Sequence, residues 1–127
     1  MLQFRYMLKI LKAGTSLGSG WQGCEQLSKY LIDSGIEEVF NYLEYNYEFI
    51  NLLQPKNLPR VINPKVKNYA ALNAFNKAIY KSLTTQVSRN DVSFVWGGDS
   101  SISIGAAMAT KSIHPQSFIL NISARSG

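Results

Sequence analysis

The hydrophobic and polar positions along the chain change repeatedly between the period of a strand and the period of a helix. The segment "LKILKAG" ends its apolar run at Gly14, which predicts a buried first strand with Leu8, Ile10 and Leu11 as its apolar part. Residues 37–50, "EEVFNYLEYNYEFI", are rich in aromatic and β-branched residues and are predicted to contain a second strand. The segments "VSFVWGG" and "SFILNIS" are predicted to be the third and fourth strands.

Three segments between these strands have helical spacing. In "EQLSKYLIDSG" the residues Leu27, Tyr30 and Leu31 are expected on one helical face, and the helix is expected to end at Gly35. A longer helix is predicted from Val66 to about Val87. Its apolar stripe consists of Tyr69, Leu72, Phe75, Ile79 and Leu83. The segment "SSISIGAAMATKS" predicts a helix of small residues, whereas three prolines exclude regular structure across "LLQPKNLPRVINP".

Four strands separated by helical connections predict an α/β fold with a mostly parallel sheet. In such sheets, ligands bind at the carboxyl ends of the strands, where loops lead into helices. Three such ends can be read from the sequence: the glycine-rich loop "TSLGSGWQGC", the turn "GGDSS" and the segment "SARSG". These loops are the expected places for chemistry.

Composition limits the class of protein. The chain has 127 residues, of which 46% are hydrophobic and 17% charged, so it can bury one core and forms one domain or part of one. Its one cysteine, Cys24, cannot form an internal disulfide, which favours a reducing compartment and predicts the cytoplasm, with the mitochondrion as an alternative. No apolar run approaches the roughly 18 residues of a membrane span, so no membrane partner is expected.

The net charge of +5 raises the question of a nucleic-acid partner. Six of the eight acidic residues lie between Glu25 and Glu48, and the basic residues are scattered. Their densest group surrounds the proline-rich segment and consists of Lys56, Arg60, Lys65 and Lys67. Because no nucleic-acid recognition signature accompanies these residues, we expect a solvated loop and no nucleic-acid partner.

The turn "GGDSS" does not match the simple chemical motifs. No Lys-Ser/Thr pair follows it as in a phosphate-binding loop, and no Gly-x-Ser-x-Gly spacing surrounds Ser100 or Ser101. The one histidine, His114, precedes Pro115 and is expected at a helix end. Taken alone, these residues favour a structural role, in which Asp99 or Ser100 caps the following helix.

The segment "VWGGDSSISIGAA" nevertheless resembles the ureohydrolase family of arginases, agmatinases and formiminoglutamases, whose strand and turn read Gly-Gly-Asp-His-Ser before a small-residue helix. "AGTSLGSGWQGCEQLSKYL" is similar to the family's first strand and glycine-rich loop, and "IHPQSFILNISAR" aligns with its His-Pro, strand and Asp-Ala-His-x-Asp segment. The resemblance covers nearly the whole chain but only about 40% of a typical member. It implies a three-layer, arginase-like parallel sheet flanked by helices, incomplete with about four strands, in a partial domain over residues 1–127.

The resemblance also implies what the chain lacks. Family members bind two manganese ions through the histidine of Gly-Gly-Asp-His and the three polar residues of Asp-Ala-His-x-Asp, and a bridging hydroxide attacks a guanidinium or amidine carbon. The matching positions here are Ser100, Ser123, Arg125 and Gly127, while the turn keeps Gly97, Gly98 and Asp99. We therefore expect no manganese cofactor and name no catalytic residue, and the substrate-binding residues stay unknown.

Three functional hypotheses follow. The first is a degenerate ureohydrolase without manganese-dependent guanidino hydrolysis, which acts by association with itself or with an active relative. The second is a fragment of an active arginase-, agmatinase- or formiminoglutamase-type hydrolase. The third is a changed site around Asp99, Ser100, Ser123 and Arg125, in which Arg125 holds an anionic substrate but no general base is nearby.

The family's strand order places the first three strands side by side and the fourth apart from them. The segment "SFILNIS" must then pair elsewhere, remain unpaired or add to another molecule, and the third strand is expected to have an open edge.

Overall fold

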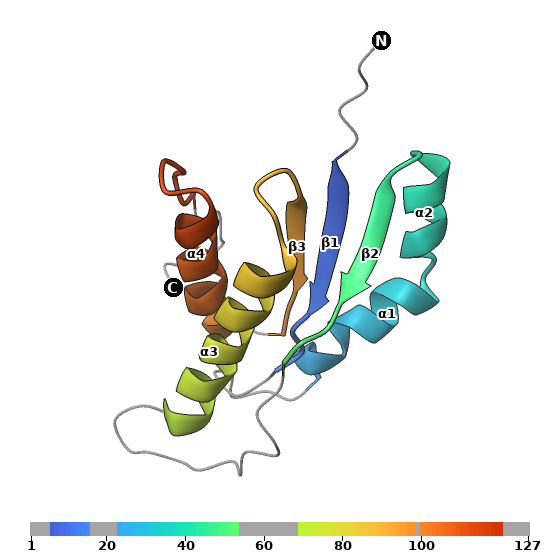
Figure 1. Cartoon of the computed structure of the whole chain (residues 1–127). Coiled ribbons are helices and arrows are strands. Elements are labelled where there is room, and N and C mark those ends of the chain that lie inside the picture. The colour runs from blue at the N-terminus through green and yellow to red at the C-terminus, as the bar shows by residue number, and fades with distance from the viewer. Residues whose placement is uncertain (1–5, 16–22, 54–68, 99, 121–127) are drawn as a thin grey trace.

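The computed structural model describes residues 6–15, 23–53, 69–98 and 100–120, and it forms an α/β fold with one sheet (Figure 1). The elements in chain order are β1 (Met7–Lys12), the 3-10 turn η1 (Cys24–Gln26), α1 (Leu27–Asp33), α2 (Ile36–Tyr42), β2 (Asn46–Ile50), α3 (Tyr69–Gln86), β3 (Val92–Trp96), the 3-10 turn η2 (Ser100–Ile102) and α4 (Ser103–Ile113).

The sheet has three parallel strands in the order β2-β1-β3. Leu8 in β1 lies opposite Tyr47 in β2 and opposite Val92 in β3, which fixes the register on both sides. The prediction that the first three strands lie side by side is confirmed.

The predicted fourth strand is not formed where the structure describes it. Residues 117–120 have no strand structure, and the rest of that segment, 121–123, lies outside the described residues. The side chains of Phe118 and Leu120 are exposed and bury no apolar surface that would hold a strand. Ser117 is held in a turn instead, because its N–H donates to the His114 carbonyl at 3.0 Å. The described sheet therefore has three strands where the sequence predicted about four.

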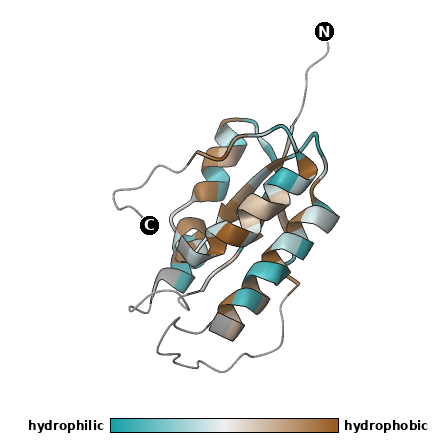
Figure 2. Cartoon of the chain, turned by 90° about the vertical axis from the view of Figure 1, so that its left-hand side faces the viewer, coloured by the Kyte–Doolittle hydropathy of each residue, from teal (hydrophilic) through white to brown (hydrophobic). Residues whose placement is uncertain are grey.

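Helices cover both faces of the sheet. Because successive side chains of a strand point to opposite faces, the core is divided into one cluster on each face. Leu11, Ile50 and the partly buried Val95 pack with Ile79 and Leu83 of α3 on one face. Figure 2, in which this side faces the viewer, shows α3 and α4 side by side in front of the strands. The other face carries an aromatic cluster packed against α1 and α2, formed by Phe40, Tyr47, Phe49 and Trp96 with Ile10. The predicted three-layer arrangement is confirmed.

Residues 37–50 contain the predicted second strand, β2, after the helix α2. The first half of the segment predicted to contain the second strand forms α2, because two glutamates in its first turn favour a helix N-terminus and Phe40 packs into the aromatic cluster. In α1, Leu27 and Tyr30 are exposed, and the buried residue is Ser28. Leu31 and Ile32 are partly buried and pack against the aromatic cluster.

The long helix α3 agrees with its prediction. Phe75, Ile79 and Leu83 are buried at the predicted spacing. The buried Ser82 hydroxyl donates to the Ala78 carbonyl at 2.7 Å and accepts from the Leu53 N–H at 2.9 Å. This polar side chain therefore connects α3 to the segment after β2 without leaving a buried group unpaired. The proline-rich segment before α3 lies largely outside the described residues.

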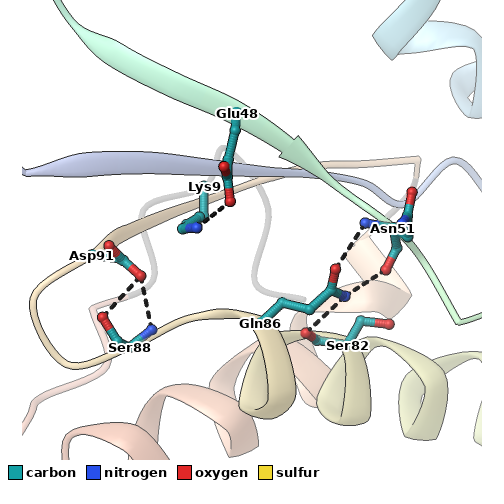
Figure 3. Close-up of polar contacts among 7 residues, drawn as sticks. All are labelled: Lys9, Glu48, Asn51, Ser82, Gln86, Ser88 and Asp91. Atoms are coloured by element: carbon teal, nitrogen blue, oxygen red, sulfur yellow. Dashed lines mark hydrogen bonds and ion pairs between the residues drawn. The ribbon is translucent and has the colours of Figure 1, made fainter.

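The last turn of α3 also binds the backbone beyond β2. The Gln86 side-chain amide donates to the Asn51 carbonyl at 2.7 Å and accepts from the Asn51 N–H at 3.1 Å (Figure 3). It thereby occupies both backbone hydrogen-bonding groups of the residue that follows β2. Farther along the sheet, Lys9 of β1 forms an ion pair with Glu48, its register partner in β2.

Candidate functional site at the carboxyl ends of β1 and β3

Three backbone segments converge at the carboxyl ends of β1 and β3, and glycine makes their approach possible. Gly98 has φ +61°, and a Cβ atom on it would lie 2.5 Å from the Thr15 carbonyl oxygen. A Cβ on Gly14 would lie 2.2 Å from the Glu25 carbonyl oxygen. Any side chain at these positions would collide with backbone, so the two glycines hold the loop after β1, the turn after β3 and the start of η1 in contact. We call this contact the glycine junction.

The start of α4, just after the glycine junction, is held by α3. The Asn76 side chain accepts the Gly105 N–H through Oδ1 at 2.7 Å and donates through Nδ2 to the Ser101 carbonyl at 2.9 Å. The N-cap residue of α4 is Ile102, which makes no side-chain cap hydrogen bond. The prediction that Asp99 or Ser100 caps the helix stays a prediction, because Asp99 and the side chain of Ser100 lie outside the described residues. The Gly105 N–H is satisfied by Asn76 from the neighbouring helix.

The residues predicted from the turn are only partly placed. Gly97 and Gly98 follow β3 directly, and Ser100 is the first residue of η2, so all three lie at this edge of the sheet. Asp99 lies outside the described residues, as do the remaining candidate ligand positions Ser123, Arg125 and Gly127. The structure brings the glycines and Ser100 to the end of β3 beside Thr15, and it leaves the other four positions untested.

His114 lies far from the glycine junction. It is the C-cap residue of α4, as the sequence predicted for a histidine before proline. The eleven residues of α4 separate the two ends by about 16 Å, since a helix rises 1.5 Å per residue. His114 therefore takes no part in chemistry at the carboxyl ends of the strands.

The described side chains around the glycine junction offer few groups for catalysis. The Glu25 carboxylate accepts the Gly23 N–H at 2.8 Å, and the Lys12 ammonium lies 4.6 Å from the centre of the Phe49 ring. The Thr15 residue is buried. Across the described ranges, no group of three or more histidine, cysteine, aspartate or glutamate side chains is arranged to hold a metal ion. The contacts of Glu25 and Lys12 stabilise the loop backbone and the sheet, and they do not orient a side chain for catalysis.

Sequence reasoning missed two residues that organise this end of the molecule. Asn76 interrupts the apolar stripe of α3, and a polar residue at that position is a signal for an interhelical hydrogen bond. Trp96 ends β3 with 1% of its surface exposed, and its ring lies 5.6 Å from Phe49 and 6.5 Å from Phe40. Its position at the end of an apolar strand was visible in the sequence, but its role as the centre of the aromatic cluster was not.

One titrating group is clearly perturbed, and it lies away from the glycine junction. Burial raises the pKa of the Tyr47 hydroxyl above its ordinary value, and the hydrogen bond that it donates to the Glu37 carboxylate at 3.1 Å raises that pKa further. The neutral phenol is the form that donates this bond, so the effect concerns stability at high pH rather than catalysis near neutrality.

Comparison with known proteins gives a clear result for structure. No family model matches the sequence, and no curated protein matches it. The fold is similar to that of the Entamoeba histolytica arginase in complex with L-ornithine, with a TM-score of 0.67 and 21% identity over 91% of this chain. It is also similar to the arginases of Bacillus caldovelox and Bacillus subtilis, with TM-scores of 0.66 and 0.64, identities of 22% and 19%, and coverage of 85% and 84% of this chain.

The chain therefore has an arginase-like fold, and the resemblance predicted from the sequence is confirmed at the level of the fold. It spans 39%, 34% and 37% of the length of the E. histolytica, B. subtilis and B. caldovelox arginases, respectively. No helix within the described residues is long and apolar enough to cross a membrane.

Proposed function

We propose that this chain, with its arginase-like fold, does not hydrolyse guanidino compounds with a manganese pair and acts by association, with itself or with an active ureohydrolase. The observation that carries the proposal is the turn after β3. This turn retains Gly97 and Gly98, and Gly98 packs against the Thr15 backbone. The turn continues to Ser100, where the resembling family has a histidine ligand.

The substitutions would weaken a manganese site in more than one way. Manganese(II) prefers carboxylate oxygen and imidazole nitrogen, and the neutral hydroxyls of Ser100 and Ser123 are poor replacements. Gly127 has no side chain to offer. Arg125 would place a permanent cation near a dication, and two unit charges at 4 Å already repel by about 4 kcal/mol at an effective dielectric constant of about 20. A two-metal centre lowers the pKa of its bound water only when its ligands hold both ions.

The second candidate function is that of a part of an active arginase-, agmatinase- or formiminoglutamase-type hydrolase. The observation that favours it is the coverage, since the chain spans 34–39% of the arginases that it matches. Sequencing the transcript from which the chain is translated tests this candidate. A reading frame that continues into an Asp-x-Asp segment, which carries the later metal ligands of the resembling family, favours this candidate. A stop codon after Gly127 opposes it.

We also propose that the chain works in the cytoplasm, without nucleic acid or membrane as a partner. The single cysteine supports a reducing compartment, since it leaves no internal disulfide to form. Fractionation of cells that express the tagged chain tests the location, and a mitochondrial signal would contradict it.

A comparison of the unchanged chain with one fourfold variant tests the loss of catalysis. Urea release from arginine and agmatine, and formamide release from formiminoglutamate, are measured with added Mn²⁺ for the chain and for the variant S100H/S123D/R125H/G127D. We expect no release from the unchanged chain. The fourfold variant restores the ligand types of the resembling family and is expected to bind Mn²⁺ more tightly in calorimetric titration. Manganese-dependent turnover by the unchanged chain would overturn the proposal.

A further inference from the structure

The strand β3 forms an edge of the described sheet. On its other side β3 pairs with β1, and no described strand pairs with its free side. Val92 is 48% exposed and Phe94 is 43% exposed, on the sheet face that carries the aromatic cluster. Figure 1 shows α2 beside β2, and α4 on the side of β3 that faces away from β1. The exposed backbone edge and two exposed apolar side chains are therefore adjacent.

The opposite edge, β2, is protected in ways that β3 is not. Glu48 places a charge within β2, and the Gln86 amide occupies the backbone N–H and carbonyl of Asn51 just beyond it. Charged residues and covered backbone are common means of preventing edge-to-edge pairing. The sequence of β3, Val-Ser-Phe-Val-Trp, contains no charge and no proline. The contrast within one sheet indicates that β3 is suited to pairing.

We propose that β3 pairs with β3 of a second copy of this chain, antiparallel about a two-fold axis through Phe94. This inference rests on the proposed function by association and names its partner and its surface. Full overlap of the five residues places Phe94 opposite Phe94 of the second copy, and Val92 opposite Trp96 of the second copy. The result is a continuous sheet of six strands in which each Phe94 is covered by its symmetry mate.

Self-pairing fits the chemistry of this strand. A two-fold interface must be complementary to itself, and a strand with no charge brings no like charges into opposition. Aromatic and β-branched pairs across antiparallel strands contribute roughly 0.2–1 kcal/mol each. The two-fold axis is perpendicular to the sheet, so the α3/α4 layers of the two copies lie on the same face of the joined sheet.

The described part of the chain's own C-terminal segment does not pair with this edge. The Lys111 ammonium donates to the carbonyls of Pro115 and Ser117 at 3.0 and 2.7 Å, which fixes the turn after α4. Phe118 then follows with 97% of its surface exposed. Residues 117–120 thus make no strand with β3.

The test is the molar mass in solution of the full chain and two charge variants, measured by sedimentation from low micromolar to near-millimolar concentration. Val92→Lys places a charge on the proposed interface, whereas Val39→Lys is a matched control at a valine of α2 that is 49% exposed. We expect the unchanged chain and the control to form dimers with rising concentration, and Val92→Lys to stay monomeric. A monomer at every concentration, or a dimer that Val92→Lys leaves intact, would overturn the inference.

A crosslink tests the register and does not depend on Val92→Lys folding normally. In a Cys24→Ser background, Phe94→Cys is expected to form a covalent dimer under mild oxidation, because the two-fold axis brings the two sulfurs together. Val39→Cys in the same background is expected to stay monomeric. Equal crosslinking of both variants would contradict the register. These results are independent of the urea and manganese measurements. The proposed dimer can therefore be refuted while the proposed loss of catalysis stands, and the loss of catalysis can be refuted while the dimer stands.

Discussion

The Oδ1 atom of Asn76 in α3 accepts the backbone N–H of Gly105 in α4 at 2.7 Å, and the two residues also touch through their backbones. A Cβ atom on Gly105 would lie 2.4 Å from the Asn76 carbonyl oxygen. This contact determines how closely α3 and α4 pack, directly after the turn that contains Ser100. The position of that turn therefore depends on an interhelical contact as well as on the strand before it.

Replacing Gly105 by alanine is expected to lower the free energy of unfolding by about 1–3 kcal/mol, because the added methyl group must push the two helices apart. Urea denaturation followed by circular dichroism measures this change. Ile104→Ala is the control, since Ile104 is exposed and its truncation is expected to change stability by no more than about 0.5 kcal/mol. Equal stability of Gly105→Ala and the unchanged chain would contradict the close approach of the helices.

Asn76→Ala removes the acceptor for the Gly105 N–H and the donor to the Ser101 carbonyl. We expect a loss of about 1–3 kcal/mol in the free energy of unfolding, because part-buried backbone groups are left without partners. Asn73→Ala, one turn earlier on α3 and exposed, is the matched control. If both variants lose the same small amount, Asn76 does not hold the start of α4.

The Tyr47 hydroxyl gives the fold a stability component that depends on pH. Because its pKa is raised in the folded chain above the ordinary value of 10.0, this component is fully present below about pH 10 and is lost as the pH rises through the raised pKa. Tyr47→Phe should therefore lack this alkaline loss, while Tyr42→Phe, at an exposed tyrosine, should retain it. Unfolding by denaturant at several pH values measures the difference, and identical pH profiles of all three proteins would contradict the prediction.

The proposed dimer should respond to salt in a way that identifies its chemistry. Each copy carries a net charge of +5, so two copies repel at low ionic strength, and added salt screens that repulsion. We expect the dissociation constant of the dimer to fall as sodium chloride is raised from low concentration to about 0.5 M, where the Debye length is well under 10 Å. A dissociation constant that rises with salt would indicate an interface held by ion pairs and not by the uncharged β3.

Most of the fold could be predicted from the sequence where one period dominated a segment. The spacing of Phe75, Ile79 and Leu83 predicted α3, and the apolar run around Ile10 predicted β1. Residues 37–50 contain the predicted strand β2, but the helix α2 before it was missed, because aromatic residues favour strands in general and Phe40 packs into its cluster from a helix. Sequence reasoning failed at Phe118, since an apolar segment forms a strand only when a neighbour pairs with it.

The candidate site was less accessible to sequence reasoning than the fold. The turn containing Gly97 and Gly98 could be recognised because a strand, two glycines and a small-residue helix follow one another closely. The partners of that turn could not, since Thr15 and Asn76 approach it from segments far away in the sequence. Such contacts depend on tertiary packing, and no local spacing determines them.

The central claim is that this arginase-like chain does not hold a manganese pair, and metal content tests it most directly. The purified chain, with its intact mass confirmed, is dialysed against Mn²⁺ and then against metal-free buffer, and manganese per chain is measured by elemental mass spectrometry. The account predicts a manganese content near zero in a sample whose circular dichroism shows a folded protein. A content near two manganese ions per folded chain would contradict it.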